Sequence, residues 1–149
     1  MSLFDQINDD IKAAMLAKDK VKLGALRNVK KLFLEAKTAP GANDTLSDDD
    51  ALKIIQKLVK QGKDSAQIYI DQNRQDLADE ELAEVGAIAS YLPQQLSAEE
   101  LESELKSIIA NVGATSPQDM GKVMGVATKA LSGKAEGRAI SETVKRLLS

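Results

Sequence analysis

Apolar residues recur every three to four positions along almost the whole chain, and no segment alternates apolar and polar residues over the length of a strand. This period matches the 3.6-residue turn of an α-helix, so the pattern predicts an all-α protein. Two stripes of this kind open the sequence, with a break near Asp19 between them: Leu3, Ile7, Ile11 and Met15, then Leu26, Val29, Phe33 and Ala36. We expect the corresponding helices to pair as a hairpin.

Two more helices are predicted before a proline near the middle of the chain. Residues 38–46 are small and polar and include a Pro-Gly pair, and Ser47 with Asp50 three residues later resembles a capping box. The helix that starts there should run to about Gln72. The fourth helix must end before Pro93, because proline lacks an amide donor and disfavours helix at the residue before it. Its expected core positions are Leu77 or Ala78, Leu82, Val85 and Ile88.

The remaining third of the chain predicts three further helices. Ser97 and Glu100 form a full capping box, and Gly113 is placed to end the helix that this box begins. Ser116 followed by Pro117 predicts the next helix start, and an apolar stripe that includes Ile140 marks the last helix. We therefore expect an N-terminal helical domain of about four helices over residues 1–92 and a small three-helix C-terminal domain over residues 93–149.

Composition narrows the possible chemistry. The 149 residues include no His, Cys or Trp and only two Phe and two Tyr, with a net charge of −3. An imidazole base, a thiolate nucleophile, a disulfide and a Cys-His metal site are therefore excluded. The acidic run Asp48–Asp50 is better explained as complementing a helix N-terminus than as a metal site, because consecutive helical residues point about 100° apart. We predict no catalytic residue, no metal and no cofactor.

The localisation and the distribution of charge follow from the same sequence. The N-terminus lacks the basic and apolar regions of a signal peptide, and no apolar run is long enough to cross a membrane, so we expect a cytoplasmic protein with no membrane partner. Residues 1–37 carry a net charge of +3, residues 38–105 carry −10, and residues 106–149 carry +4. The two ends are basic and the middle is acidic.

The basic residues of the last third are the strongest binding candidates. At 100° per residue, Lys122 and Lys129 share one helix face and Arg138 and Lys145 share another. Lys134 lies in the glycine-punctuated turn between these helices, where backbone amides at a helix N-terminus can meet a phosphate. The alternative explanation is a helix stop and a solvated cationic face. Few aromatic residues are present for base stacking, so a nucleic acid would be held through its phosphates.

Three further sets of residues complete the candidates. Gly121 and Gly125 each cost about 1 kcal/mol relative to Ala inside a helix, so we expect the close approach of a neighbouring helix or of a ligand backbone there. Gly133 is expected to stop a helix, and Gly137 to permit close packing. A secondary basic stripe is predicted on the second helix and consists of Lys20, Arg27 and Lys31.

Several segments resemble the GatB/YqeY family, in the same order along nearly the whole chain. Residues 113–124 (GATSPQDMGKVM) and 133–138 (GKAEGR) are similar to the family signature. Residues 91–96 (YLPQQL) are similar to its interdomain segment, and residues 26–27 and 74–78 resemble its N-terminal motifs. Two mild departures are Glu136, where the family usually has Asp, and Gly24.

The resemblance implies an all-helical protein whose C-terminal part is similar to the tail domain of the GatB subunit of glutamine-dependent aminoacyl-tRNA amidotransferases, which meets the elbow of tRNA. The catalytic domain of GatB is absent. Our first hypothesis is therefore an accessory module that binds tRNA or a tRNA–enzyme complex without catalysis of its own. A second is a component of carbon–nitrogen ligase activity with glutamine as amide donor, inside a complex. A third is a protein–protein adaptor that uses the acidic central region.

Overall fold

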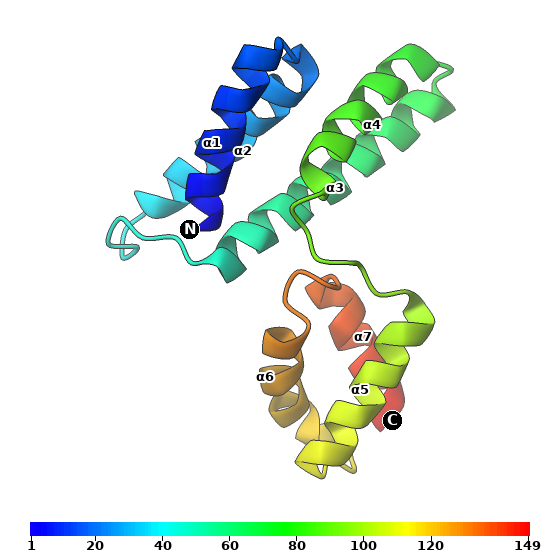
Figure 1. Ribbon diagram of the computed structural model, residues 1–149. Coiled ribbons are helices and arrows are strands. Elements are labelled where there is room, and N and C mark those ends of the chain that lie inside the picture. Colours follow the sequence, from blue (N-terminus) through cyan, green and yellow to red (C-terminus); the bar gives the residue numbers. More distant parts are fainter. The chain divides into compact units, whose positions relative to one another are not determined.

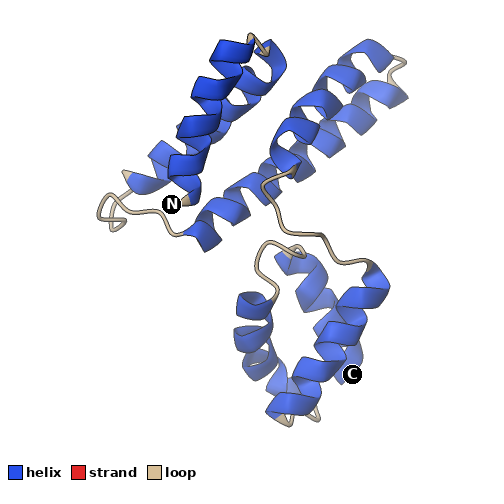
Figure 2. Ribbon diagram, in the orientation of Figure 1, coloured by secondary structure: helices blue, strands red, loops and turns tan.

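A computed structural model describes all 149 residues and contains seven α-helices, one short 3₁₀ turn and no strand (Figures 1 and 2). The predicted all-α class is confirmed. The helices are α1 (Leu3–Ala17), α2 (Lys20–Lys37), α3 (Asp48–Asp71), α4 (Gln75–Ala89), α5 (Ala98–Val112), α6 (Met120–Ala130) and α7 (Gly137–Leu148), and the 3₁₀ turn η1 (Pro117–Asp119) leads into α6. None of the helices combines the length and the apolar character needed to cross a bilayer.

The chain forms two compact units, Met1–Leu92 with α1 to α4 and Pro93–Ser149 with α5 to α7. Each unit has its own apolar core. In the first, Ile7 from α1, Phe33 from α2 and Ile55 from α3 are fully buried. In the second, a smaller cluster from α5, α6 and α7 includes Leu105, Val123 and Val144.

The helix ends follow the local signals in the sequence. Lys18 adopts a left-handed conformation (φ 56°) at the end of α1, and Asp19 then caps α2 by accepting a hydrogen bond from Lys22 N at 3.1 Å. Ser47 Oγ accepts from Asp50 N at 3.2 Å at the start of α3. Ser97 and Glu100 form the reciprocal capping box of α5, and Gly113 ends that helix with φ 71°.

The crossing of α3 and α4 depends on a glycine. Gly62 lies on α3 facing Val85 of α4, and a Cβ added at position 62 would overlap Val85 Cγ2. Ala66 and Ala78 are also buried, with at most 2% of their surface exposed. Small residues therefore allow these two helices to approach closely.

Two residues predicted in the core lie outside it. Met15 is 53% exposed, and Ala14 is buried in its place. Leu82 is 42% exposed, whereas Ala78 and Val85 on the same helix are buried. In both helices an alanine occupies the buried position, because closely packed helices require a side chain that is small as well as apolar.

Two long-range hydrogen bonds tie the ends of the first unit to its other helices. Tyr91, just beyond α4, donates its hydroxyl to Asp10 on α1. Burial, the hydrogen bond and the charge of Asp10 raise the pKa of Tyr91 well above its usual range. Leu3 N at the start of α1 donates to Asp48 Oδ1 at the start of α3 at 2.9 Å. Asp48 therefore serves the start of α1, and all three acidic residues of the run lie in the first turn of α3.

Candidate nucleic-acid interface

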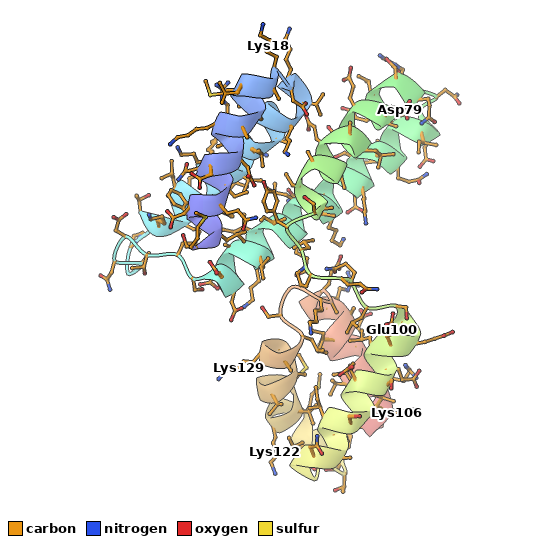
Figure 3. The ribbon with its side chains drawn as sticks, in the orientation of Figure 1. Lys18, Asp79, Glu100, Lys106, Lys122 and Lys129 are labelled. Atoms are coloured by element: carbon orange, nitrogen blue, oxygen red, sulfur yellow. The ribbon has the colours of Figure 1, made fainter.

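Lys122 and Lys129 lie on the outer side of α6. The inner side of this helix carries Val123 and Ala127, which are fully buried, and residues seven apart in a helix share a face. Both lysine side chains extend from the helix into solvent (Figure 3). No acidic side chain lies within salt-bridge distance of either ammonium group, so both charges are available to a ligand.

Asp119 fixes the start of α6 beside Lys122. Its Oδ2 accepts hydrogen bonds from Thr115 N at 2.9 Å and from Ser116 N at 3.3 Å. These bonds from Thr115 and Ser116, helped by the charge of Lys122, lower the pKa of Asp119 below its usual range. Asp119 therefore stays ionised, and its two amide donors orient the segment that carries Lys122.

Arg138 and Lys145 share an exposed face of α7. Arg138 Nε donates to Glu142 Oε1 at 2.9 Å, and the Arg138 side chain is 83% exposed, so much of the guanidinium still faces solvent. Lys145 has no ion-pair partner. Arg146, about 100° further around the helix, instead pairs with Glu102 of α5 at 3.4 Å.

The turn before α7 holds Lys134 on a fixed backbone. Gly133 is buried and has φ 75°, a left-handed conformation that favours glycine, and it lies two residues after Leu131, the C-cap of α6. Gln95 Nε2 donates to Gly133 O at 2.6 Å, and Leu96 N donates to Lys134 O at 3.0 Å. The exposed Lys134 side chain therefore extends from a turn whose backbone is fixed by hydrogen bonds from the segment before α5.

The N-terminus of α7 has no side-chain cap. Glu136 occupies the cap position, and its side chain makes no hydrogen bond to the first amides of the helix. Arg138 itself belongs to the first turn, and Lys134 lies in the preceding turn. This arrangement has the parts of the anion site that the sequence suggested, namely free amides beside two cations.

Three of the four candidate glycines face open space. A Cβ added at Gly121, Gly125 or Gly137 would meet no atom within 4 Å. The expectation that a neighbouring helix crosses closely at these positions is therefore wrong, and the tight crossing lies at Gly62 in the other unit. The sequence spacing of two glycines four residues apart does not show whether a neighbouring helix packs against them. The approach of a ligand backbone at Gly121 and Gly125 stays a prediction.

The secondary stripe of Lys20, Arg27 and Lys31 is exposed on α2, opposite the buried Leu26 and Val29. None of the three cations has an ion-pair partner. The stripe belongs to the Met1–Leu92 unit, whereas the other five candidates belong to the Pro93–Ser149 unit. The structure therefore gives two basic sets, one on each unit.

The comparison with protein families shows to which family the chain belongs. A family described as Yqey-like protein matches residues 4–148. The chain belongs to the YqeY-like family. This membership fits the resemblance to the tail domain of GatB, and it covers both compact units.

Curated relatives of this YqeY-like chain share one printed name, "Altered inheritance of mitochondria protein 41, mitochondrial". The protein from Vanderwaltozyma polyspora is 39% identical over 87 residues, which cover 58% of this chain and 46% of the relative. The protein from Lachancea thermotolerans is 32% identical over 104 residues, which cover 67% and 53%. The protein from Saccharomyces cerevisiae is 33% identical over 102 residues, which cover 64% and 51%. The chain thus spans about half the length of the curated relatives it matches.

These names correct the expected localisation. The relatives are called mitochondrial, which contradicts the cytoplasmic localisation predicted above. That prediction was based on the absence of targeting features in the first residues of the chain, and such an absence does not identify a compartment. The cytoplasmic assignment is therefore withdrawn.

Proposed function

We propose that this YqeY-like protein is an accessory module that binds tRNA, or a tRNA–enzyme complex, through phosphate contacts of the Pro93–Ser149 unit. The contacts are the exposed cations of α6, α7 and the turn between them: Lys122, Lys129, Lys134, Arg138 and Lys145. Family membership supports this proposal through the similarity to the GatB tail.

The observation that carries the proposal is how charge is divided among the helices of this unit. Helix α5 holds four glutamates and one lysine, and Glu102 pairs with both Lys106 at 3.5 Å and Arg146 at 3.4 Å. Glu102 of α5 thereby neutralises Lys106 and Arg146, and Glu142 contacts only the Nε atom of the Arg138 guanidinium. The five remaining cations face solvent, and phosphates are bound by such exposed positive charges.

The test is binding of the full chain to total tRNA across a salt series. Each neutralised phosphate contributes a slope of about −0.9 to the log–log plot of affinity against salt for duplex nucleic acid. The variant with Lys122→Ala, Lys134→Ala and Arg138→Ala should bind more weakly, and its slope should flatten by about one unit per lost contact.

A matched control removes three lysines of α3 in the other unit, Lys53, Lys57 and Lys63, which are exposed and unpaired. This variant has the same change in net charge, so it should keep most of the affinity and the slope. If the two triple variants bind alike, the phosphate contacts are misplaced. The Lys20, Arg27 and Lys31 variant should show a smaller loss than the α6–α7 variant.

A separate assay addresses the rival hypothesis of carbon–nitrogen ligation. The purified chain incubated with glutamine, ATP and mischarged Glu-tRNA should form no Gln-tRNA, because it has no His or Cys and no recognisable ATP motif. Turnover that survives repurification would replace the accessory role by catalysis. Turnover by added amidotransferase subunits that depends on the presence of this chain would support the second hypothesis, a component of a complex.

A further inference from the structure

The Met1–Leu92 unit contains a cleft between α2, α3 and α4. It has a volume of about 380 Å³, which is near the small end of the 300–1,000 Å³ typical of binding pockets. Its walls are Ala25 and Asn28 from α2, Gln61 and Ser65 from α3, and Glu81 and Glu84 from α4. Gly62 lies at the α3–α4 crossing that borders the cleft.

Exposed apolar side chains continue the cleft walls by one helical turn. Val21 precedes Gly24 by three residues on α2 and is 48% exposed, and Ile68 follows Ser65 by three residues on α3 and is 55% exposed. The start of α2 and the end of α3 lie toward the same end of the unit (Figure 1). Val21 and Ile68 thus add exposed apolar surface one helical turn beyond the cleft.

The acidic wall of the cleft has no ion-pair partner. Helix α4 carries five acidic residues and no basic one, and of these only Asp76 has an ion-pair partner, Arg74. The residues of α2 and α3 that line the cleft are neutral, and neither Glu81 nor Glu84 lies within ion-pair distance of a basic group. Burial and the neighbouring charges of Glu81 and Glu80 raise the pKa of Glu84 above its usual range.

We propose that this cleft binds a basic amphipathic helix of a partner protein, with apolar side chains of that helix between Val21 and Ile68 and cationic side chains at Glu81 and Glu84. Charge complementarity selects this occupant, since an unpaired carboxylate pair repels phosphates and attracts lysine or arginine. The shape also favours a helix, because the unit offers grooves between helices and no sheet edge to which an extended peptide can add. The site is independent of the tRNA proposal, which concerns the other unit.

The experiment uses the full chain and a synthetic 14-residue helical peptide of leucine and lysine, with its leucine–glutamate counterpart as the charge control. Fluorescence anisotropy should show binding of the lysine peptide only. The Glu81→Gln, Glu84→Gln variant should bind it about tenfold more weakly, because each exposed ion pair contributes a factor of a few to affinity. This variant removes repulsion between like charges, so it should remain folded.

The matched control is Asp79→Asn with Glu80→Gln, which removes the same charge from α4 outside the cleft and should change the affinity less than twofold. Amide resonances give the location: Gly24 and Gly62 should shift on addition of the lysine peptide, whereas Gly121 and Gly125 should not. The Lys122, Lys134 and Arg138 variant should bind the peptide as the wild type does, which separates this site from tRNA binding.

Three results would overturn the proposal. One is an equal loss in the cleft variant and the control variant, which indicates attraction to acidic charge in general. Another is a set of amide shifts that omits Gly24 and Gly62. The third is a dimer in sedimentation that disappears in the Glu81→Gln, Glu84→Gln variant, which would replace the partner helix by a second copy of this chain.

Discussion

Helices α3 and α6 both carry glycine in their interiors, and the two helices use it in opposite ways. On α3 the space beside Gly62 is filled by Val85 of α4. On α6 the space beside Gly121 and Gly125 is empty, and exposed, unpaired lysines flank it. The glycine inside α3 is therefore a packing device, whereas the glycines of α6 leave a bare surface, as Gly24 and Gly86 do in the first unit. Only the neighbouring helix distinguishes the two cases.

The largest expected effect comes from filling the packed position. Gly62→Leu should destabilise the Met1–Leu92 unit by about 3 kcal/mol in urea unfolding, because overpacking costs about 1–3 kcal/mol and the clash lies at a stiff valine. The smaller destabilisation expected for Gly62→Ala should be partly reversed by Val85→Ala, which removes the contacting methyl groups. Gly86→Leu is the control, because nothing lies within 4 Å of a Cβ at position 86. If both leucine variants unfold alike, the crossing is not tight.

The same variant also tests whether the two units are separate domains, which we propose with boundaries 1–92 and 93–149. Gly62→Leu should shift one unfolding transition and leave a second, from the Pro93–Ser149 unit, unchanged. A fragment of residues 93–149 should retain its helical circular dichroism. A single shifted transition together with an unfolded fragment would show one cooperative unit.

Replacing the glycines that face open space should change the free energy of unfolding in the opposite direction and by a smaller amount. Gly121→Ala and Gly125→Ala should each stabilise the chain by up to about 1 kcal/mol, because alanine is the better helix former and the added methyl meets nothing. If a ligand backbone approaches these glycines, tRNA affinity should fall while stability rises. Destabilisation by either change would indicate a packed neighbour and remove the contrast with Gly62.

The hydrogen bond from Tyr91 to Asp10 predicts a pH-dependent effect of about 1 kcal/mol, measured as the difference between wild type and Tyr91→Phe in urea unfolding at neutral pH. The folded state raises the pKa of Tyr91 above its ordinary value of 10.0, so the stabilisation is present below pH 10 and decreases as the pH rises further. The difference between the two proteins should therefore shrink in alkaline solution. Tyr69→Phe serves as the control, and a difference that is constant with pH would contradict the assignment.

The smallest effect on stability is expected for the variant with Lys122→Ala, Lys134→Ala and Arg138→Ala. Each side chain is exposed, so each change should alter the free energy of unfolding by no more than about 0.5 kcal/mol. The lost pair between Arg138 and Glu142 is solvated and contributes little. Thermal melting followed by circular dichroism provides the measurement. A large loss would mean that these cations support the fold, and the tRNA result would then need a milder variant.

Local signals in the sequence predicted much of this fold because helix starts and stops are short-range events. Ser47, Ser97 and Gly113 form their caps from residues within a few positions. The failures at Met15 and Leu82 are long-range. Both residues satisfy the helical period, but the approach of a neighbouring helix selected the smaller Ala14 and Ala78, and hydrophobic spacing along one helix carries no information about that neighbour.

The candidate site was predictable to a similar depth. Exposure of the four helical cations Lys122, Lys129, Arg138 and Lys145 followed from their angular distance to the apolar stripe, which one helix defines by itself. The pairing of Glu102 with Arg146, and the hydrogen bond from Gln95 to Gly133, join residues more than thirty positions apart. The cleft bounded by Glu81 and Glu84 needs three helices at once. Periodicity therefore identifies a charged face, but only tertiary structure shows which charges on it remain unpaired.

The bond between Tyr91 and Asp10 has a topological consequence for the Met1–Leu92 unit. It joins the last turn of the unit to its first helix, while the Leu3 amide is held by Asp48. The connection at residues 38–46 takes part in neither contact. A rearranged polypeptide that joins Leu92 to Met1 through a flexible linker and begins instead at Gly41 should therefore keep all four helices and both contacts, since the order of segments along the backbone is not what holds this unit together.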